Sequence, residues 1–311
     1  NNPYRIWVSE VMLQQTRVAV VVLYYKTFLR VFPTIRKLAT SGREHVLKLW
    51  AGMGYYQRAE NLHRTAQILL RQYGGKFPSE LEKIKRLPGI GDYTARAILS
   101  IAYKQPLAVM DGNVARVISR IYRLSGDPSR SSFKNNVSKR LDNLLSRRSP
   151  GNFNQAIMEL GQTICLPRSP QCSRCPLRNS CAAYQYGDVE RFPAHPRRRK
   201  SRRVYLASLV LQSGSKVLMV RGLKEGLLKG LWNFPSAFGD SRGQALTRLQ
   251  GDLTESIGRC LSPNTTVLNL EHRITFRVIS VDIYKVRSAN QTSMNGSRWM
   301  DLRILEGVAT S

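Results

Sequence analysis

Four of the five cysteines in this sequence stand close together, with the spacing C-x6-C-x2-C-x5-C: Cys165, Cys172, Cys175 and Cys181. The disulfide framework of a secreted protein spreads its cysteines along the chain, whereas local crowding is typical of a metal or iron–sulfur site. Four thiolates can hold either a zinc ion or a 4Fe–4S cluster, and the spacing by itself favours zinc. We therefore expect the segment 165–181 to fold as a loop around an inorganic centre.

The charge of the chain restricts its partners. Lysine and arginine total 49 against 20 aspartates and glutamates, which gives a formal net charge of +29. Such an excess is typical of a protein that binds a polyanion, and it favours nucleic acid over an acidic membrane surface. No apolar run reaches the roughly 18 residues that a membrane span needs, and no signal peptide is visible. We expect an intracellular protein associated with DNA and no membrane partner.

The texture of the 311 residues predicts two domains. Up to about residue 160, apolar residues recur at helical spacing between Gly and Pro breaks, as in 17–31 and 45–50. Six basic residues in the seven at 197–203 are typical of a solvated linker. Strand-like segments follow at 204–212, 216–221 and 273–286, with a helical stretch at 244–257. The sequence predicts an all-α domain over 1–190, a basic linker over 191–203 and an α+β domain over 204–311.

The segment 79–102 reads as two helices joined by a short hairpin. Ser-Glu-Leu-Glu at 79–82 has the form of a capping box, which predicts the start of the first helix. Leu87-Pro88-Gly89-Ile90-Gly91 then separates it from a second helix. Backbone amides in such a turn, at a helix N-terminus, can bind phosphate without reading a base. An ordinary helix–turn–helix corner is the alternative, and the positive charge of the chain favours the phosphate-binding interpretation.

Two carboxylates stand in contrasting surroundings. Glu10 lies among apolar residues, which predicts burial and a raised pKa, as a general acid requires. Asp111 precedes a helical stretch at 112–118, where the helix dipole and free amides hold a carboxylate ionised. One protonated and one ionised carboxyl is the division that glycosidic bond cleavage needs. Taken singly, Glu10 can be a solvated helix residue and Asp111 a plain N-cap.

These motifs together resemble a known family. The Leu-Pro-Gly-Ile-Gly hairpin, the cysteine spacing and Val-Met-Asp-Gly-Asn at 109–113 are similar to the helix–hairpin–helix DNA glycosylases. Ser-Glu-Val-Met-Leu-Gln-Gln-Thr at 9–16 and Gly-Met-Gly-Tyr-Tyr at 52–56 narrow the resemblance to the MutY-type adenine DNA glycosylases. The resemblance covers nearly the whole chain. It implies that the cysteine loop holds a 4Fe–4S cluster rather than zinc.

The resemblance also implies catalytic roles. Glu10 would protonate a ring nitrogen of adenine, and Asp111 would stabilise the sugar cation, with or without a covalent intermediate. Asn113 would orient Glu10 or the sugar. Tyr93 stands where related bifunctional glycosylases carry a Schiff-base lysine, and a phenol cannot form that imine. The enzyme is therefore expected to be monofunctional.

DNA contacts are implied at several further positions. Gln15 and Tyr55 match family positions that wedge into the duplex when the adenine is flipped out. The alternative is that Gln15 lies on a helix surface and that Tyr55 is a core residue. The hairpin positions Leu87, Gly89 and Gly91 would lie against the DNA backbone. Arg168, Arg174 and Arg178 lie in or beside the cysteine loop, where they could contact phosphate.

Residues 204–311 resemble the Nudix-like C-terminal domain of the same family, anchored by the segment 227–235. The stretch 251–258 lacks the arginine and one of the paired glutamates of a working Nudix box, so we expect no catalytic metal there. The family uses this domain to recognise 8-oxoguanine, usually with Phe-Ser-His. This chain has Phe276-Arg277-Val278 instead, which keeps the Phe for DNA contact and loses the two polar side chains.

The reading that unites these features is an adenine DNA glycosylase. It would excise adenine opposite 8-oxoguanine, and opposite guanine, from duplex DNA, acting as a monomer in base excision repair. A bifunctional pyrimidine-lesion glycosylase of the endonuclease III type is disfavoured by Tyr93 and by the second domain. A catalytically silent DNA-binding protein is the alternative from another class.

Overall fold

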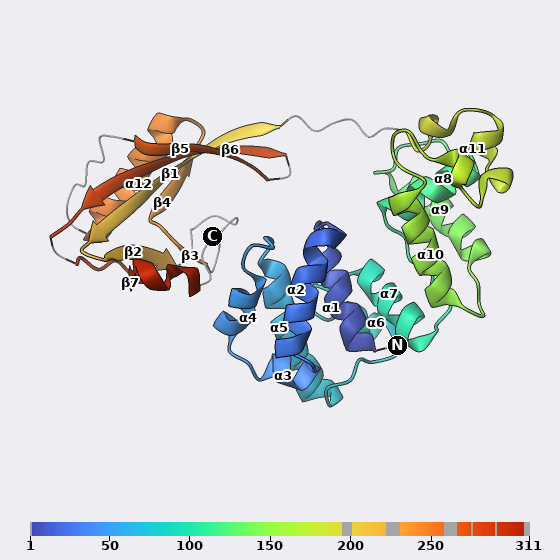
Figure 1. Cartoon of the computed structure of the whole chain (residues 1–311), viewed down its shortest axis with the longest axis horizontal. Coiled ribbons are helices and arrows are strands. Elements are labelled where there is room, and N and C mark those ends of the chain that lie inside the picture. The colour runs from blue at the N-terminus through green and yellow to red at the C-terminus, as the bar shows by residue number, and fades with distance from the viewer. Residues whose placement is uncertain are drawn as a thin grey trace. The chain divides into compact units, whose positions relative to one another are not determined.

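The computed structural model describes residues 2–194, 201–221, 231–257, 266–274, 276–289 and 291–307. By its internal contacts the chain forms two compact units, Asn1–Arg197 and Arg198–Ser311 (Figure 1). Most of the basic run at 197–203, and Leu227–Gly230 of the expected Nudix-like anchor, lie outside the described residues.

The described part of the first unit consists of helices joined by short turns, as the sequence predicts. The α-helices are α1 (Pro3–Leu13), α2 (Val18–Val31), α3 (Ile35–Ala39), α4 (Arg43–Trp50), α5 (Gln57–Tyr73), α6 (Leu81–Lys85), α7 (Asp92–Tyr103), α8 (Gly112–Ile121), α9 (Ser131–Leu144), α10 (Pro150–Thr163) and α11 (Ala182–Gln185). Three short 3-10 turns, η1 (Cys172–Arg174), η2 (Arg178–Ser180) and η3 (Val189–Arg191), lie in and after the cysteine segment. Among the described residues, none of the helices is both long and apolar enough to cross a membrane.

Helices α1, α2 and α4 each bury an aromatic side chain that packs against other rings. Phe28 of α2 packs edge-on against Phe32 at 5.0 Å between ring centroids and against Trp50 at 6.1 Å. Trp7 of α1 is 1% exposed and meets Phe77 edge-on at 5.3 Å. Edge-to-face pairs at these distances add to the free energy gained by apolar burial. The packing fixes the direction of α1, the helix that carries Glu10.

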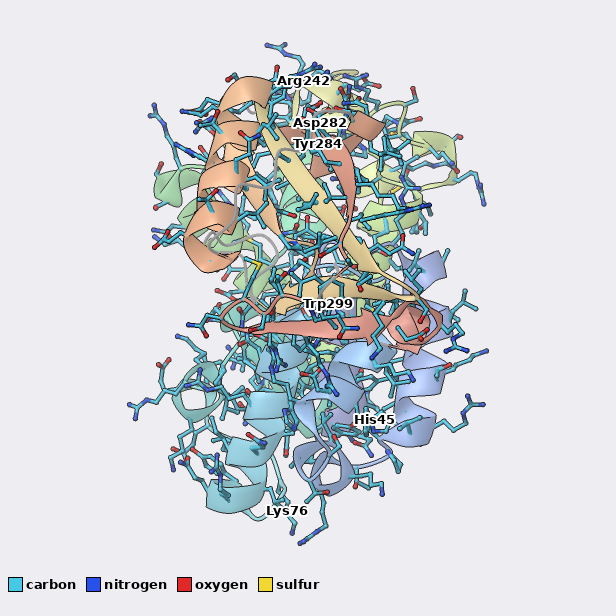
Figure 2. The ribbon with its side chains drawn as sticks, turned by 90° about the vertical axis from the view of Figure 1, so that its left-hand side faces the viewer. His45, Lys76, Arg242, Asp282, Tyr284 and Trp299 are labelled. Atoms are coloured by element: carbon cyan, nitrogen blue, oxygen red, sulfur yellow. The ribbon has the colours of Figure 1, made fainter. Side chains whose placement is uncertain are left out.

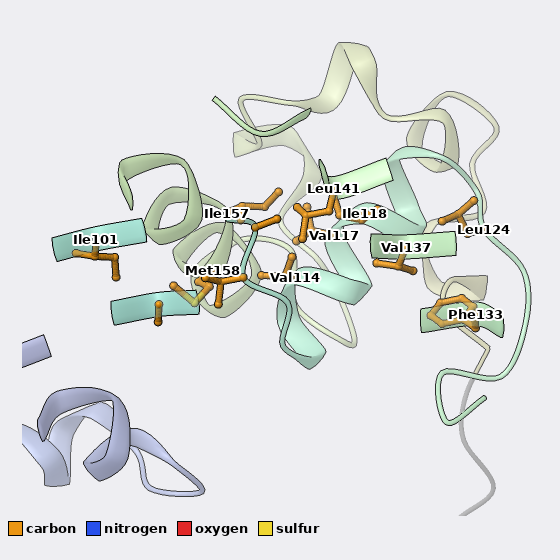
Figure 3. Packing of buried hydrophobic residues seen from close by; sticks show 13 residues of the cluster. Ile101, Val114, Val117, Ile118, Leu124, Phe133, Val137, Leu141, Ile157 and Met158 are labelled. Atoms are coloured by element: carbon orange, nitrogen blue, oxygen red, sulfur yellow. The ribbon is translucent and has the colours of Figure 1, made fainter. Parts of the chain in front are cut away.

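A second core holds α8 between its neighbours. Figure 3 shows Val114, Val117 and Ile118 of α8 pointing among apolar residues of α7, α9 and α10. All three are at most 2% exposed. The N-terminus of α8, where Asp111 is the cap, is therefore held by a packed helix and not by a loop alone.

The hairpin between α6 and α7 forms as predicted, but its first helix does not begin with a capping box. The N-cap is Glu80, without a side-chain capping bond, in place of the expected Ser79. The carbonyl of Ser79 instead accepts a hydrogen bond from Gln105 Nε2 at 2.6 Å, and the Glu80 carboxylate pairs with Lys83 at 2.7 Å. The Glu80 carboxylate is thus engaged in an ion pair and not in a cap.

The second unit is an α+β fold built on one mixed sheet. Its strands are β1 (Arg202–Ser213), β2 (Lys216–Arg221), β3 (Trp232–Asn233), β4 (Ser236–Gly239), β5 (Thr266–Ile274), β6 (Arg277–Arg287) and β7 (Ser297–Asp301). The order is β3-β2-β1-β6-β5, with β4 paired to β1 and β7 paired to β2. Strands β1 and β6 are parallel, and the other pairs are antiparallel. A 3-10 turn, η4 (Leu302–Gly307), follows β7.

Helix α12 (Arg242–Ile257) covers one face of this sheet through a buried apolar stripe. Ala245, Leu249 and Leu253 of α12 pack on residues of β1 and β4 and on Tyr284 of β6. Arg242 at the start of the helix faces the buried Asp282 of β6 at 3.7 Å; both residues and Tyr284 are labelled in Figure 2. The helix expected at 244–257 is confirmed, with two further residues at its start.

Two boundaries in the second unit differ from expectation. Strand β1 begins at Arg202, so the last two residues of the expected linker are part of the sheet. The stretch 273–286 is not one strand, because it breaks after Ile274 and a hairpin returns at Arg277. The predicted hairpin around Gly214 is confirmed by the antiparallel pair Ser213 and Lys216.

Candidate active site and iron–sulfur loop

Glu10 lies in the C-terminal half of α1, among the buried residues Val8, Val11 and Met12. Burial raises the pKa of the Glu10 carboxyl, a hydrogen bond with Tyr93 opposes that rise, and the nearby Asp111 carboxylate adds to it. The apolar setting predicted from the sequence is therefore present, and a solvated helix residue is the wrong interpretation. A carboxyl in this environment keeps its proton to higher pH than an ordinary glutamate, as a general acid requires.

Tyr93 stands one residue into α7 and faces Glu10. Burial raises the pKa of its phenol, and the charge and hydrogen bond of Glu10 and the charge of Asp111 raise it further. The hydroxyl also lies 3.1 Å from Met158 Sδ of α10. The side chains of α1, α7 and α10 thus meet at this phenol, which stays protonated and can donate a hydrogen bond.

Asp111 is the N-cap of α8, as its position in the sequence predicts. Its Oδ1 accepts a hydrogen bond from the Val114 amide at 2.7 Å, and its Oδ2 accepts one from Asn113 Nδ2 at 3.0 Å. These bonds fix the carboxylate in one orientation near Glu10 and Tyr93, whose pKa values it influences. Asn113 thus bonds to Asp111 and not to Glu10, which is one of the two partners that the resemblance implies for it; its contact with the sugar stays a prediction.

Arg116 continues this network toward the cysteine loop, and sequence reasoning missed it. Its NH2 donates to Asn113 Oδ1 at 3.0 Å and to the Gly161 carbonyl at 2.7 Å, and its Nε donates to the Cys165 carbonyl at 2.8 Å. A side chain on Gly161 would stand 2.8 Å from the Asn113 Cβ, so only glycine lets α10 approach α8 this closely. Asn113, Arg116 and Arg120 follow one another at helical spacing, which is the signal that could have identified this polar face.

Cys165, Cys172, Cys175 and Cys181 line one small cavity together with Arg120, and none of the four is in a disulfide. Arg120 is 2% exposed, and its NH1 donates to Cys165 Sγ at 3.3 Å and to the Leu166 carbonyl at 2.6 Å. Four free thiols around one cavity, with a buried cation beside them, suit a negatively charged thiolate-bound centre. When bound, such a cluster would fix the fold of the loop.

Gln15 and Tyr55 lie on two turns, and not on a helix surface and in the core. Gln15 follows the end of α1, outside any helix, and is exposed. Tyr55 precedes α5 and is 42% exposed, so it is not a core residue. Both side chains are therefore exposed at the surface of the first unit, where a duplex could reach them.

The hairpin 87–91 is anchored to α5. Gly89 has φ +75°, and a Cβ there would stand 2.7 Å from the Asn61 Cβ, so both conformation and space require glycine. Thr65 donates to the Pro88 carbonyl at 2.8 Å, and Leu87 is 4% exposed. Gly91 is the N-cap of α7 and offers no capping side chain, which leaves the first-turn amides of α7 to other acceptors.

In the second unit, Phe276 stands at the tip of the β5–β6 hairpin and is 40% exposed. Its carbonyl accepts a hydrogen bond from the Arg202 amide at 2.8 Å, and the guanidinium of Arg277 lies 5.7 Å from its ring centroid. Val278 is half-buried in β6, opposite Arg273. Thr275 before this Phe, Gly258 at the end of the altered Nudix stretch, and Cys260, the fifth cysteine of the chain, lie outside the described residues. Asp252 and Glu255, from the altered Nudix stretch, are exposed on α12.

Comparisons with known proteins agree with this arrangement. Residues 8–143 match the HhH-GPD superfamily of base excision DNA repair proteins, and residues 165–181 match the iron–sulfur binding domain of endonuclease III. A solved thermostable thymine-DNA glycosylase superposes with a TM-score of 0.53 at 27% identity, over 60% of this chain and 85% of that one. The first unit is thus that of a helix–hairpin–helix base excision repair protein. Its cysteine loop is a 4Fe–4S site and not a zinc site.

Curated relatives define the family more closely. The adenine DNA glycosylase of Rattus norvegicus is 33% identical over 363 residues, which cover 99% of this chain and 69% of that protein. The adenine DNA glycosylase of Homo sapiens is 33% identical over 99% of this chain and 66% of its own length. The chain therefore belongs to the adenine DNA glycosylase family, and it spans about two thirds of the length of these relatives.

Proposed function

We propose that the chain removes adenine from A:8-oxoguanine and A:G mispairs in duplex DNA by hydrolysis of the N-glycosidic bond. The observation that carries the proposal is the meeting of Glu10, Tyr93 and Asp111 at one point between α1, α7 and α8. One carboxyl there has a raised pKa, and the other is bound by two hydrogen-bond donors. Two such different environments let one carboxyl act as a general acid while the other stabilises a cation.

Glu10 is the proposed general acid. It transfers its proton to a ring nitrogen of the flipped-out adenine as the bond between the base and the sugar carbon breaks. The bonding electrons leave with the base, which departs as neutral adenine. The Tyr93 hydroxyl, buried beside Glu10, holds the carboxyl in place through its hydrogen bond. Burial is what keeps the proton available, because desolvation disfavours the carboxylate form.

Asp111 is the proposed stabiliser of the sugar cation that remains. Its carboxylate is held by the Val114 amide and the Asn113 side chain, so it needs little reorganisation when positive charge develops on the sugar. A water molecule then adds to the sugar carbon and loses a proton, which gives an abasic site. Tyr93 has no amine to form an imine, so the reaction ends there without strand cleavage.

The first unit also supplies the proposed DNA contacts. A backbone phosphate binds to the amides at the start of α7 and to the hairpin residues Leu87, Gly89 and Gly91. The one acidic side chain in the first turn of α7, Asp92, does not repel it strongly, because it is paired with Arg96 at 2.7 Å. Gln15 and Tyr55 fill the space that the flipped adenine leaves in the duplex. The four cysteines hold the cluster that shapes the loop 165–181, with Arg168, Arg174 and Arg178 available to phosphate.

The second unit is the proposed reader of the base opposite adenine. Phe276 is exposed at a hairpin tip, where an aromatic ring can stack on a base. Arg277 beside it strengthens attraction to phosphate without reading sequence. The protein acts as a monomer on duplex DNA in this proposal.

The experiment that tests the function is a base-release assay on four duplexes that place 8-oxoguanine, guanine, cytosine or thymine opposite adenine. We expect free adenine from the first two, fastest with 8-oxoguanine, and abasic DNA that breaks only after alkali treatment. Strand cleavage without alkali would support the bifunctional alternative. Tight duplex binding without release of any base would support the silent DNA-binding protein.

A further inference from the structure

The two proposed wedge residues share an uncommon backbone conformation. Gln15 has φ +55° and Tyr55 has φ +48°, both in the left-handed region that residues other than glycine rarely occupy. Such conformations persist only where the surrounding structure over-determines them, and they gather at binding and active sites. Other residues must therefore hold the two turns in this conformation.

Arg58 contacts the turn that carries Gln15. Its NH1 donates hydrogen bonds to the carbonyls of Val11 at 3.1 Å and Met12 at 2.8 Å, and also to the carbonyl of Gln14. Its NH2 donates to Thr16 Oγ1 at 3.0 Å. The Gln14 carbonyl belongs to the peptide that leads into Gln15, so the guanidinium fixes the plane of that peptide.

The same guanidinium contacts the turn that carries Tyr55. Its NH2 donates to the carbonyls of Met53 and Gly54, each at 3.2 Å. The Gly54 carbonyl belongs to the peptide that leads into Tyr55, and it also accepts from Trp50 Nε1 at 3.1 Å. The guanidinium carbon lies 5.4 Å from the Tyr55 ring centroid and 5.3 Å from that of Trp50. One buried side chain thus orients the peptide before each left-handed residue.

We propose that Arg58 is a positioning residue that locks the turns of Gln15 and Tyr55 into a single two-pronged wedge. The proposal rests on the proposed function, because it concerns how the same enzyme opens the duplex. Arg58 is 8% exposed and stands on the buried stripe of α5 with Leu62, Thr65 and Leu69, so it cannot itself reach DNA. Its effect on base flipping must pass through the two turns.

Arginine suits this position better than lysine. Its planar fork presents donors on two sides at fixed angles, whereas an ammonium offers one compact centre on a flexible stem. The acceptors come from two separate turns of the chain, with Gln14 and Thr16 in one and Met53 and Gly54 in the other. Arg58→Lys keeps the positive charge but cannot hydrogen-bond to both turns at once.

The experiment compares Arg58→Met and Arg58→Lys with Arg71→Met, a change at an exposed arginine near the far end of the same helix. The duplex carries adenine opposite 8-oxoguanine, with 2-aminopurine next to the adenine to report unstacking by fluorescence. The single-turnover rate of base release and the iron content are measured on the same preparations. Arg58→Met is also introduced into the double variant Gln15→Ala, Tyr55→Ala.

We expect Arg58→Met to lose most of the fluorescence rise and to slow base release about tenfold or more, as the loss of a buried hydrogen-bond network does. Arg58→Lys should lie between it and the parent, and Arg71→Met should behave as the parent. In the Gln15→Ala, Tyr55→Ala background, Arg58→Met should slow release by less than about twofold further, because residues that act through one another are not additive. The pH profile of base release should be unchanged in every Arg58 variant.

Losses that add fully in the doubly substituted background, or a parent-like fluorescence rise in Arg58→Met of normal iron content, would overturn the proposal. If both Arg58 variants fail to fold, Thr16→Val removes one acceptor and keeps the cation; it should reduce the fluorescence rise in part, and a parent-like signal then counts against the proposal. Failure of the proposed function is distinguishable, because it removes base release from the parent chain as well.

Discussion

Arg116 Nε donates a hydrogen bond of 2.8 Å to the carbonyl oxygen of Cys165, the first cysteine of the iron–sulfur loop. The same guanidinium donates to Asn113 Oδ1 at 3.0 Å, and Asn113 in turn donates to Asp111 Oδ2 at 3.0 Å. One continuous chain of hydrogen bonds therefore runs from the cysteine loop to the proposed cation stabiliser.

Replacement of Arg116 by Met should disturb both ends of this chain. The lost bonds leave the Asn113 side chain and two carbonyls without their donor, and each such loss costs about 1–3 kcal/mol. We expect base release at least about tenfold slower and a lower iron content, with helix content near the parent's by circular dichroism. Normal release together with a full complement of iron would show that the chain of bonds is not functional.

Glu10→Gln should stabilise the protein at neutral pH. Folding raises the pKa of Glu10 above its ordinary value of 4.5, so the folded state binds the proton more tightly than the unfolded state. The stability contributed by this carboxyl is therefore fully present below pH 4.5 and is lost as the pH rises through the raised pKa. Glutamine carries no charge at any pH and avoids the loss.

Thermal unfolding measured at a series of pH values checks this point. The Tm of Glu10→Gln should exceed that of the parent at pH 7, because the parent carboxyl has lost its stability contribution there. The difference should narrow as the pH falls toward 4.5. Two curves that stay parallel over the whole range would mean that Glu10 is not desolvated.

Tyr93→Lys should gain strand-cleaving activity. Tyr93 lies beside Glu10, with its hydroxyl 3.1 Å from Met158 Sδ, so an amine at this position would stand close to the sugar carbon of a flipped nucleotide. The expected signature is a protein–DNA adduct trapped by borohydride. Tyr93→Phe is the matched control and should give no adduct. An equal background in both variants would place residue 93 away from the sugar.

Arg277→Ser combined with Val278→His should increase the preference for 8-oxoguanine over guanine. Arg277 is exposed at the start of β6, and Val278 cannot donate a hydrogen bond. A regained donor pair is worth roughly 1–3 kcal/mol of discrimination. Dissociation constants on the two mispairs, at one fixed salt concentration, measure the change. Unchanged discrimination would show that the base is read by other residues.

The sequence predicts the burial of Glu10 and the cap position of Asp111, because each depends on a local pattern. The apolar neighbours of Glu10 indicate its burial, and the helix after Asp111 indicates its cap. Arg58 and Arg116 could not be predicted in the same way. Most of their acceptors are main-chain carbonyls, several of them far along the chain, such as that of Cys165, and a carbonyl has no sequence signature. A charged residue on the buried stripe of α5 is the signal that Arg58 did offer.

Two predicted boundaries of helices and strands were wrong. Ser79 has the residue type of an N-cap, yet its carbonyl binds Gln105 and the helix begins after Glu80. The break after Ile274 in the expected strand 273–286 carries no glycine or asparagine to mark a turn. By contrast, the helical period of the first unit and the Gly214 hairpin have clear local patterns and were predicted.

The most direct test of the central claim is single-turnover release of adenine from a duplex with 8-oxoguanine opposite it, for the parent, Glu10→Gln and Asp111→Asn. Both replacements keep the size of the side chain, and both should bind the duplex as tightly as the parent. We predict that each lowers the rate by at least 100-fold, on the order of 3 kcal/mol of barrier. A rate within about tenfold of the parent for either variant, at equal duplex binding, would contradict the role assigned to that carboxylate.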